Sequence, residues 1–356
     1  MRIGIPSEIK PMEGRVGLIP EACSMLVQAG HEVFVQKGAG NKSGYADAQF
    51  VQAGVSLLPD ATAVYEKAEL IVKVKEPVDP EIEFLRKDHI LFSYLHLAAA
   101  TDLMTRLLDI GLTGVAFETV EDHGRLPLLA PMSDIAGRLS VQVGTHLLHQ
   151  PQGGKGLLLG GLPAADRGHV VVIGGGVAGG NAARMAAGLG ARVTVFDTNR
   201  ERLAEMRDIG PNVTGLYPYP AAVHDMVAQA DLLVGAVLLV GAKAPHVVSS
   251  AMVSDMETGS VLVDISVDQG GCIATTRPTN YKDPTYIEEG VIHFCVTNMP
   301  GAVPRTASQA LSASVTPYVL KLAAKDWRKD EALKAGINVD KGKLVHPALQ
   351  SLVKAA

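Results

Sequence analysis

The chain has 356 residues, of which 47% are hydrophobic and 19% charged, with 37 glycines and few aromatic residues. This composition is typical of α/β enzymes and excludes an intrinsically disordered chain. A formal net charge of -5 provides no basic surface for nucleic acid. The length exceeds that of one ordinary hydrophobic core and predicts about two domains.

The sequence gives no indication of export or membrane insertion. The opening residues, MRIGIPSEIK, lack the apolar stretch of a signal peptide. The longest apolar run, residues 232–242, is shorter than a membrane span and is interrupted by glycine. Cys23, Cys272 and Cys295 have neither paired nor metal-ligand spacing. We therefore expect a cytoplasmic protein with no metal and no membrane contact.

Residues 1–130 are expected to alternate between strands and helices. Strands are indicated by RIGIP, HEVFVQ, LIVKVKEP, DHILFSYLHL and GLTGVAFETV, and a helix by PEACSMLVQAG before Gly30. This alternation predicts an α/β layer of its own. The segment GAGNKSG lacks the spacing of a P-loop and is not interpreted as a phosphate-binding loop.

The strand-like run LIVKVKEP carries two lysines that would leave the same face of a strand. One interpretation is a half-buried strand whose solvated face carries Lys73 and Lys75. The other places Lys75, next to the proline that ends the run, at the mouth of a site, because strand ends commonly carry the chemistry of α/β proteins.

A long helix is predicted from Ser133 to Gln150, with Ser133 as its N-cap. Apolar residues recur along it at helical spacing: Ile135, Leu139, Val143 and Leu147. His146 and His149 lie one turn apart, but no third ligand accompanies them. We interpret them as surface or interface residues rather than as a metal site.

The strongest local signal is the segment HVVVIGGGVAGGNAARMAAGLGARVTVFD, residues 169–197. Gly174, Gly176 and Gly179 follow four apolar β-formers and match G-x-G-x-x-G, and Asp197 ends the next strand. In such a unit the glycines permit a tight turn, close approach of a pyrophosphate and close helix packing. The helix N-terminus offers N–H donors to the phosphates. The segment therefore predicts dinucleotide binding, with a purely structural glycine-rich turn as the alternative.

Further buried parallel strands are predicted at ADLLVGAVL, GSVLVDISVD and VIHFCVTNMP. Asp268 lies just past the second of these strands, before a Gly-Gly turn; taken alone, it would be a turn residue. After Pro304, the segment TASQALSASVTPYVLKLAAKDW predicts a helix that returns to the first domain.

Eight motifs carry a resemblance to a known family: EIKPMEGRVGLIPE, VKVKEP, SYLHLAA, LLAPMSDIAGRLS, the glycine-rich unit, GAVLLVGAKAP, DISVDQGG and TNMPGAVPRT. In order and spacing they resemble the alanine dehydrogenase family, which also includes transhydrogenase α-subunits, over nearly all of the chain. The resemblance implies an α/β fold with two Rossmann-like domains and parallel sheets. A NAD-binding domain (131–304) would be inserted into a substrate domain (1–130 and 305–356). It also implies NAD-dependent, reversible deamination of L-alanine to pyruvate and ammonium.

The resemblance places catalytic roles on His96 and Asp268 and substrate binding on Arg15, Lys75 and Leu129. Residue chemistry agrees with these roles. Arg15 offers a planar fork to a carboxylate, and Lys75 a mobile ammonium to a carboxylate or carbonyl oxygen. An imidazole such as that of His96 suits proton transfer near neutrality. Asp268 could position the attacking water or the amine. Without the resemblance, Arg15 would be read as a surface arginine and His96 as a core histidine.

The cofactor is expected to be NAD. Gly174, Gly176, Val177, Ala178 and Gly179 would face the pyrophosphate, and Asp197 the adenine ribose. The family pattern alone adds a second set around the NAD: Ser133, Arg202, Leu238, Ile265, Asn298 and Met299. An acid at position 197 disfavours the 2′-phosphate of NADP, although Arg200 and Arg202 could neutralise such a phosphate. Hydride transfer would place the site in a cleft between the domains, closed against water.

Three alternatives stay open at this stage: a NAD-binding α-subunit of a proton-translocating transhydrogenase, an opine- or saccharopine-type amino-acid dehydrogenase, and a NAD-binding regulator without turnover. The family resemblance further implies a homohexamer, for which the helix of residues 133–150 is the candidate interface.

Overall fold

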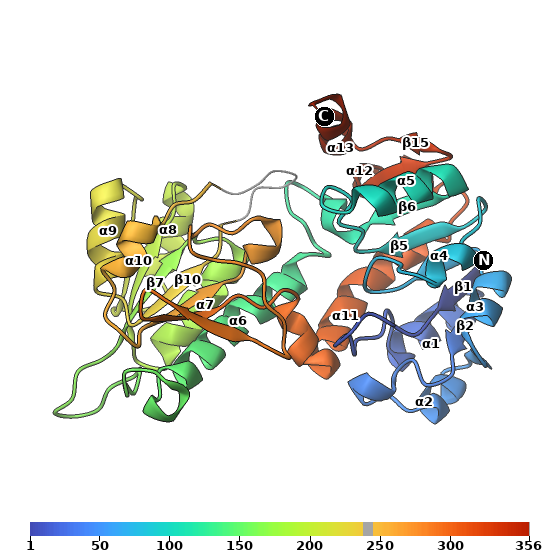
Figure 1. The fold of residues 1–356 in the computed structure, drawn as a ribbon. Coiled ribbons are helices and arrows are strands. Elements are labelled where there is room, and N and C mark those ends of the chain that lie inside the picture. Colours follow the sequence, from blue (N-terminus) through green and yellow to red (C-terminus); the bar gives the residue numbers. More distant parts are fainter. Residues whose placement is uncertain (238–244, 356) are drawn as a thin grey trace. The chain divides into compact units, whose positions relative to one another are not determined.

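The computed structural model describes residues 1–237 and 245–355 of the chain. It divides into two compact units, the first formed by Met1–Met132 with Gly301–Ala356 and the second by Ser133–Pro300 (Figure 1). The second unit is thus a continuous segment inserted into a discontinuous first unit.

The first unit contains an eight-stranded sheet in the order β15-β14-β6-β5-β4-β1-β2-β3. The strands are β1 (Arg2–Ile5), β2 (Glu32–Gln36), β3 (Ser56–Leu58), β4 (Leu70–Val72), β5 (Ile90–Ser93), β6 (Thr113–Ala116), β14 (Ile337–Asp340) and β15 (Lys343–Leu344). The first six pair in parallel, and β14 and β15 extend the sheet antiparallel. The central strands are apolar and buried because helices cover both faces of such a sheet.

The C-terminal segment returns to this unit, where β14 lies beside β6 (Figure 1). Helix α11 also reaches the N-terminal loop, since the Ser308 hydroxyl accepts from the Val16 backbone N–H at 3.0 Å and Ser312 from that of Ile19 at 3.0 Å. The helices of the unit are α1 (Pro20–Gln28), α2 (Asp47–Gln52), α3 (Ala61–Lys67), α4 (Glu81–Phe84), α5 (Thr101–Ile110), α11 (Pro304–Leu322), α12 (Glu331–Gly336) and α13 (Pro347–Ala355), with 3-10 turns η1 (Asn41–Ser43), η2 (Phe117–Thr119) and η6 (Trp327–Lys329).

The second unit contains a seven-stranded sheet in the order β12-β13-β11-β10-β7-β8-β9, parallel except for the edge strand β12. Its strands are β7 (His169–Ile173), β8 (Arg192–Phe196), β9 (Val213–Leu216), β10 (Leu232–Gly235), β11 (Val261–Asp264), β12 (Thr285–Glu288) and β13 (Val291–Phe294). From β7 the sheet grows in one direction through β8 and β9 and in the other through β10, β11 and β13. This doubly wound order is the arrangement of dinucleotide-binding sheets.

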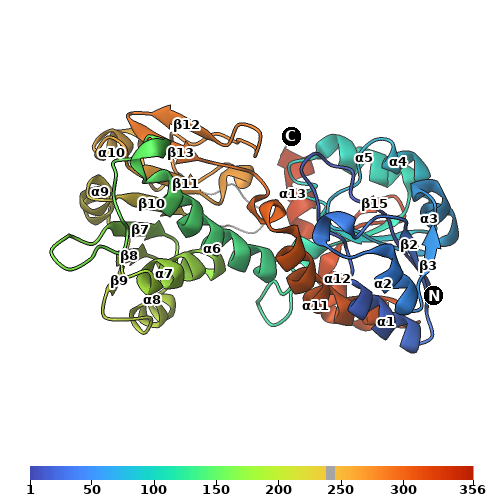
Figure 2. The same cartoon turned by 90° about the horizontal axis from the view of Figure 1, so that it is seen from below.

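Helices cover both faces of this sheet: α6 (Ala130–Leu147), α7 (Val177–Gly188), α8 (Arg200–Arg207), α9 (Pro220–Ala228) and α10 (Ser250–Ser254), with η3 (Gln150–Gln152), η4 (Val267–Gln269) and η5 (Met299–Ala302). Figure 2 shows α6 beside α7. The two helices approach closely at Gly137, where a Cβ would lie 2.1 Å from the Ala178 carbonyl oxygen. A side chain at position 137 would therefore separate the helices.

The predicted α/β fold with two parallel-dominated sheets is confirmed, and two local expectations are wrong. Ser133 is not an N-cap, because α6 begins at Ala130 and has Pro131 in its first turn. Strand β4 ends at Val72, and Lys73 is wholly buried instead of lying on a solvated face. Within the described residues, no helix is long and apolar enough to cross a membrane.

Candidate active site

Lys75 and His96 follow two neighbouring strands. β4 and β5 run parallel, with Val72 opposite Phe92, so their carboxyl ends share one edge of the sheet. The pairing continues past β4, since the Lys73 N–H donates to the Phe92 carbonyl at 3.2 Å and the Tyr94 N–H to the Val74 carbonyl at 3.0 Å. The structure thus brings Lys75 and His96 together at the edge where parallel sheets carry their ligands.

His96 has a left-handed backbone, with φ of 49°. Such a conformation is costly for a residue other than glycine and needs support from its surroundings. Glu118 provides it, because one carboxylate oxygen accepts from the His96 N–H at 2.6 Å and from the Leu95 N–H at 3.2 Å. The imidazole stacks on Tyr94, with ring centroids 5.7 Å apart and planes inclined by 23°. Main chain and ring of His96 are therefore both fixed.

Glu76 orients the His96 ring through its Nδ1 atom. The carboxylate lies 3.3 Å from His96 Nδ1 and also forms an ion pair with Lys10. Burial alone would raise the pKa of Glu76. The hydrogen bond with His96, the charges of Lys75 and His96 and the hydrogen bond with Lys10 instead hold that pKa well below its usual value. With Nδ1 donating to this carboxylate, Nε2 is left as the nitrogen that can exchange a proton.

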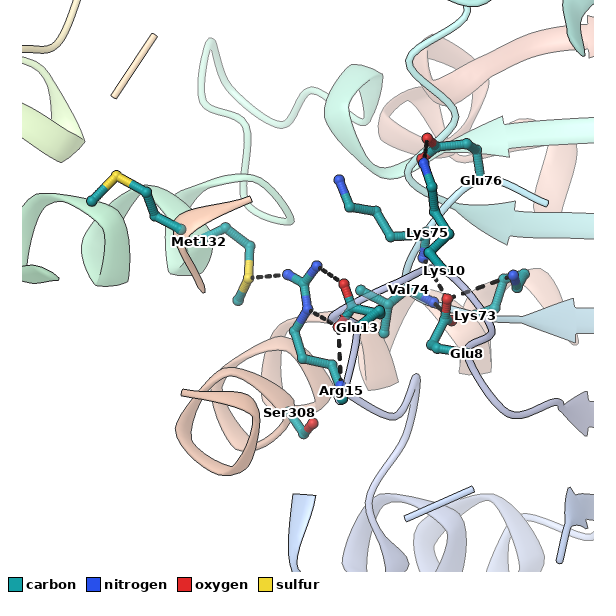
Figure 3. A network of polar contacts seen from close by, with 12 residues as sticks. Glu8, Lys10, Glu13, Arg15, Lys73, Val74, Lys75, Glu76, Met132 and Ser308 are labelled. Atoms are coloured by element: carbon teal, nitrogen blue, oxygen red, sulfur yellow. Dashed lines mark hydrogen bonds and ion pairs between the residues drawn. The ribbon is translucent and has the colours of Figure 1, made fainter. Parts of the chain in front are cut away.

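The Lys75 side chain extends away from Lys73 (Figure 3). Its backbone N–H donates to Glu8 at 3.3 Å, whereas its ammonium has no hydrogen bond or ion pair within the described part of the chain. Burial and the nearby positive charges of Arg15 and Lys10 lower the pKa of Lys75, against the opposing charge of Glu76. A partly desolvated ammonium of this kind favours an incoming anion or carbonyl oxygen.

Arg15 is 2% exposed and is held by Glu13. Nε donates to one carboxylate oxygen at 2.8 Å and Nη2 to the other at 2.6 Å, while Nη1 lies 3.1 Å from the Met132 sulfur (Figure 3). Burial alone would lower the pKa of Arg15, but the Glu13 carboxylate raises it. The guanidinium was predicted to be a ligand fork; in the structure one of its edges already faces an acid. Glu13, Arg15, Lys75, Glu76 and His96 are called the charged cluster below.

The loop that carries Arg15 is fixed by hydroxyl groups. Ser43 donates to the Gly14 carbonyl at 2.7 Å and lies 2.9 Å from the Ser308 hydroxyl, which accepts from the Val16 N–H. A Cβ on Gly17 would lie 2.9 Å from the Val72 carbonyl oxygen, so the loop packs directly on the end of β4. The loop that carries Arg15 is therefore supported by the end of β4, by η1 and by α11.

The predicted dinucleotide turn between β7 and α7 has the geometry that its glycines allow. Gly174 has φ of 99°, which only glycine adopts without strain, and Gly176 is the N-cap of α7. A Cβ on Gly179 would lie 1.8 Å from the Gly174 carbonyl oxygen. Val177 is 49% exposed at the first turn of the helix, beside Ala178. This turn leaves backbone N–H groups and the helix N-terminus open to a phosphate.

Asp197 follows β8 and belongs to the same turn. One carboxylate oxygen accepts from the Gly175 N–H at 2.7 Å and the other from the Asn199 N–H at 2.7 Å. Arg202 lies 3.7 Å from the first oxygen. The acid is thus fixed in place, and Arg202, one of the two arginines that could meet a 2′-phosphate, is paired with it.

Asp268 lies in η4 and is exposed. Its loop folds around Asp264, whose carboxylate accepts from the Ser266 N–H and hydroxyl at 3.0 and 2.7 Å, the Cys272 N–H at 3.1 Å and the Thr276 hydroxyl at 2.8 Å. Burial raises the pKa of Asp264, although these hydrogen bonds oppose the shift. Asp268 is therefore an exposed residue of a loop that is held in place by hydrogen bonds to the buried Asp264 carboxylate.

The other predicted site residues are scattered over both units. Leu129 is half-buried just before α6, and Ser133 is half-buried within it. Ile265 follows β11 and donates its N–H to the Gly235 carbonyl at 2.8 Å. Asn298 has a left-handed φ of 61°, and the Met299 carbonyl accepts from Tyr281 at 2.7 Å. Leu238 lies outside the described residues.

The sequence reasoning missed the acids that hold this site: Glu8, Glu13, Glu76, Glu118 and Asp264. Two carried a signal, because Glu13 lies two residues before Arg15 and Glu76 directly follows Lys75. The others come from distant parts of the chain, and a single sequence does not show which residues they contact. Among the residues that the structure describes, no group of three or more His, Cys, Asp or Glu side chains could hold a metal ion.

Comparisons with known proteins agree with this geometry. The model of the family "Alanine dehydrogenase/PNT, N-terminal domain" matches residues 4–136, and that of the "C-terminal domain" matches residues 140–347. The chain is 48% identical to an alanine dehydrogenase of Halomonas elongata over 355 residues, covering 98% of this chain and 96% of the relative. It is 47% identical to one of Bacillus subtilis, covering 98% and 94%.

Solved structures give the same result. One described as L-alanine dehydrogenase matches with a TM-score of 0.95 and 51% identity, covering 100% of this chain and 99% of the other. A transhydrogenase of Sinorhizobium meliloti has a TM-score of 0.85 at 24% identity, covering 98% and 100%, which is a likeness of fold alone. The resemblance inferred from the motifs is confirmed.

Proposed function

The chain belongs to the alanine dehydrogenase/PNT family, and we propose that its charged cluster, together with Asp268, carries out the family reaction. That reaction is the NAD-dependent, reversible oxidative deamination of L-alanine to pyruvate and ammonia. The assignment of roles rests on one observation. Lys75 and His96 follow the ends of two neighbouring strands, and Glu76, which is next to Lys75 in the chain, binds His96 Nδ1.

The glycine turn fits NAD. Its close approaches leave no room for a Cβ at position 179, and Asp197 is held where a ribose hydroxyl could donate to it. We assign Gly174, Gly176, Val177, Ala178 and Gly179 to the pyrophosphate. When bound, NAD supplies the acceptor for the hydride that leaves the substrate Cα. The outer contacts, at Ser133, Arg202, Leu238, Ile265, Asn298 and Met299, follow the family pattern.

Within the charged cluster, Arg15 and Lys75 bind the substrate. The Glu13 carboxylate holds the Arg15 guanidinium rigid, so its charge meets the substrate carboxylate without a further loss of side-chain freedom. The Lys75 ammonium binds the carboxylate or the carbonyl oxygen of pyruvate. The apolar side chain of Leu129 limits the space for the substrate side chain.

His96 transfers protons, and Asp268 positions the water or the amine. The His96 Nε2 takes a proton from the water that attacks the imine and returns it when the carbinolamine collapses to pyruvate and ammonia. The Glu76 carboxylate on Nδ1 stabilises the imidazolium that forms between these steps. Asp268 orients the water or the ammonium group.

The decisive assay is oxidation of NADH in the presence of pyruvate and ammonium. L-alanine should be deaminated far better than glutamate, lysine or leucine, because the motifs follow the family and the proposed pocket residue Leu129 is apolar: it offers no partner to a charged side chain and limits the space for a larger one. Comparable turnover of a long or charged amino acid would reject the L-alanine assignment. An opine- or saccharopine-type enzyme would require a primary amine larger than ammonia, and a transhydrogenase subunit or a regulator would give no pyruvate-dependent oxidation.

Three further assignments complete the proposal; the domain bounds and the hexamer follow the family pattern, and the localisation follows the cysteine spacing and the opening residues. The substrate domain comprises 1–130 and 305–356 and the NAD domain 131–304. The protein is cytoplasmic. It assembles as a homohexamer, with the helix of residues 133–150 as an interface. A monomer in light scattering at micromolar concentration would contradict the hexamer.

A further inference from the structure

Lys73 is a buried ammonium outside the proposed reaction. It is 0% exposed, and its Nζ lies 2.8 Å from one Glu81 oxygen. The same Nζ lies 3.5 Å from a Glu8 oxygen (Figure 3). An ammonium without water is costly to hold unless carboxylates pair with it, and replacing such a network by apolar side chains often stabilises a protein. A contribution to the stability of the folded protein is therefore a poor explanation for the presence of three buried charged side chains at this position.

The Glu8 carboxylate joins Lys73 to the main chain at Lys75. One oxygen accepts from the Val74 N–H at 2.6 Å, and the other accepts from the Lys75 N–H at 3.3 Å. Glu8 itself comes from the loop after β1 and is 8% exposed. A single carboxylate thus clamps two consecutive backbone N–H groups at the point where the Lys75 side chain leaves the chain.

Glu81 anchors the other side of the clamp. Its carboxylate binds Lys73, accepts from the Val78 N–H at 3.2 Å and accepts from the Tyr65 hydroxyl at 3.3 Å. Lys73 and Glu81 therefore tie together the two ends of the short segment that contains Lys75 and Glu76. Lys73, Glu8 and Glu81 are called the buried triad below.

We propose that Glu8, held by Lys73 and Glu81, is a positioning residue that fixes the main chain at Lys75 and so determines where the Lys75 ammonium meets the substrate. The inference rests on the proposed substrate-binding role of Lys75. The buried triad would not touch the substrate; it would position Lys75, which does.

The first test is Glu8→Gln, which keeps size and hydrogen-bonding atoms but replaces one acceptor by a donor. One of the two backbone N–H groups then loses its acceptor, and we expect the KM for pyruvate to rise about tenfold. The KM for NADH should not change. The control is Glu69→Gln, which removes an exposed carboxylate that accepts from the Arg2 N–H at 2.9 Å, at the other end of β4. A pyruvate KM equal to that of the wild type in folded Glu8→Gln would overturn the inference.

A double-mutant cycle separates positioning from general destabilisation. If Glu8 acts through Lys75, then Glu8→Gln should change the pyruvate KM by less than about twofold in a Lys75→Ala background, because interacting residues are not additive. The same tenfold penalty in both backgrounds would show that Glu8 acts elsewhere, and the inference would be wrong.

A readout without turnover keeps the inference separate from the proposed function. Amine acetylation followed by mass spectrometry measures the reactivity of Lys75 relative to the exposed Lys67. We expect Lys75 labelling to rise severalfold in Glu8→Gln and in the conservative Glu8→Asp, but not in Glu69→Gln. Glu8→Asp serves if Glu8→Gln fails to fold. Unchanged Lys75 labelling overturns the inference, whereas a wild type that does not turn over pyruvate overturns the proposed function.

Discussion

The glycine turn in the second unit and the charged cluster in the first unit are built in opposite ways. The turn after β7 is made of backbone, and its defining feature is the absence of side chains at Gly174 and Gly179. The charged cluster is made of long side chains, and two of them are held by a neighbouring carboxylate: Arg15 by Glu13 and His96 by Glu76.

This difference follows from what each site has to do. A pyrophosphate is bound by N–H groups that the helix already provides, so close approach matters most. A reaction that moves protons requires groups whose charge can change, and such groups stay in place only if their neighbours fix them. We expect the turn to be sensitive to added volume and the cluster to the removal of single charges.

The largest effect should come from the proton-transfer residues. His96→Ala and Asp268→Asn should each lower turnover by at least about 10²-fold, which is the usual scale of general acid–base catalysis. The KM for NADH should barely change, since neither residue belongs to the glycine turn. His224→Ala, at an exposed histidine of α9, is the matched control. Near-normal turnover of the variants would make both residues structural.

Cofactor choice tests the edge of the turn. The Asp197 carboxylate should favour NAD over NADP by about 10²-fold, because an unpaired like-charge contact with a 2′-phosphate costs several kcal/mol. Asp197→Gly should raise activity with NADP and weaken NAD, since Arg202, which lies 3.7 Å from the acid, is then released. In Asp197→Gly the Gly175 and Asn199 N–H groups also lose the carboxylate that accepts from them. Asp197→Asn is the control, because it removes the charge but keeps a side-chain oxygen as an acceptor. A wild type that uses both cofactors equally would show that the arginines govern the ribose pocket.

Added volume tests the turn itself. Gly179→Ala places a Cβ 1.8 Å from the Gly174 carbonyl oxygen, and overpacking of this kind costs about 1–3 kcal/mol. We expect NADH to bind about 10- to 10²-fold more weakly in titration calorimetry. Gly188→Ala lies in the same helix with nothing within 4 Å of the added methyl group, and it should leave NADH binding unchanged. Equal affinities of the two variants would contradict the close-approach explanation.

The smallest effect should be a pH dependence from Lys75. Burial lowers its pKa, and a lysine is charged only below its pKa, so the binding charge is lost at a lower pH than for an exposed lysine. The KM for pyruvate should therefore rise on the alkaline side, by at most about tenfold per pH unit. Lys75→Arg keeps its charge in this range and should flatten the profile. Identical profiles for the two proteins would remove Lys75 from pyruvate binding.

The sequence alone determined the features that depend on neighbours along the chain. The α/β fold class and the dinucleotide turn follow from apolar periodicity and glycine spacing, because a βα turn is a local structure. The predicted start of α6 is wrong for a local reason as well: Ser133 resembles an N-cap, but Pro131 suits the first turn of a helix that begins earlier. The short strands β3 and β15 carry too few residues for a periodic signal.

Only the tertiary structure decided which side chains hold the charged cluster. Glu118 follows β6, yet its carboxylate fixes the backbone of His96 because β5 and β6 are neighbours in the sheet. Lys73 and Lys75 occupy equivalent positions in the pattern LIVKVKEP, but the folded structure gives them different surroundings. One ammonium is turned into the core between Glu8 and Glu81, while the other is left without a partner in the described chain. Pairing of buried charges depends on contacts between distant segments, and the pattern of a single sequence does not record those contacts.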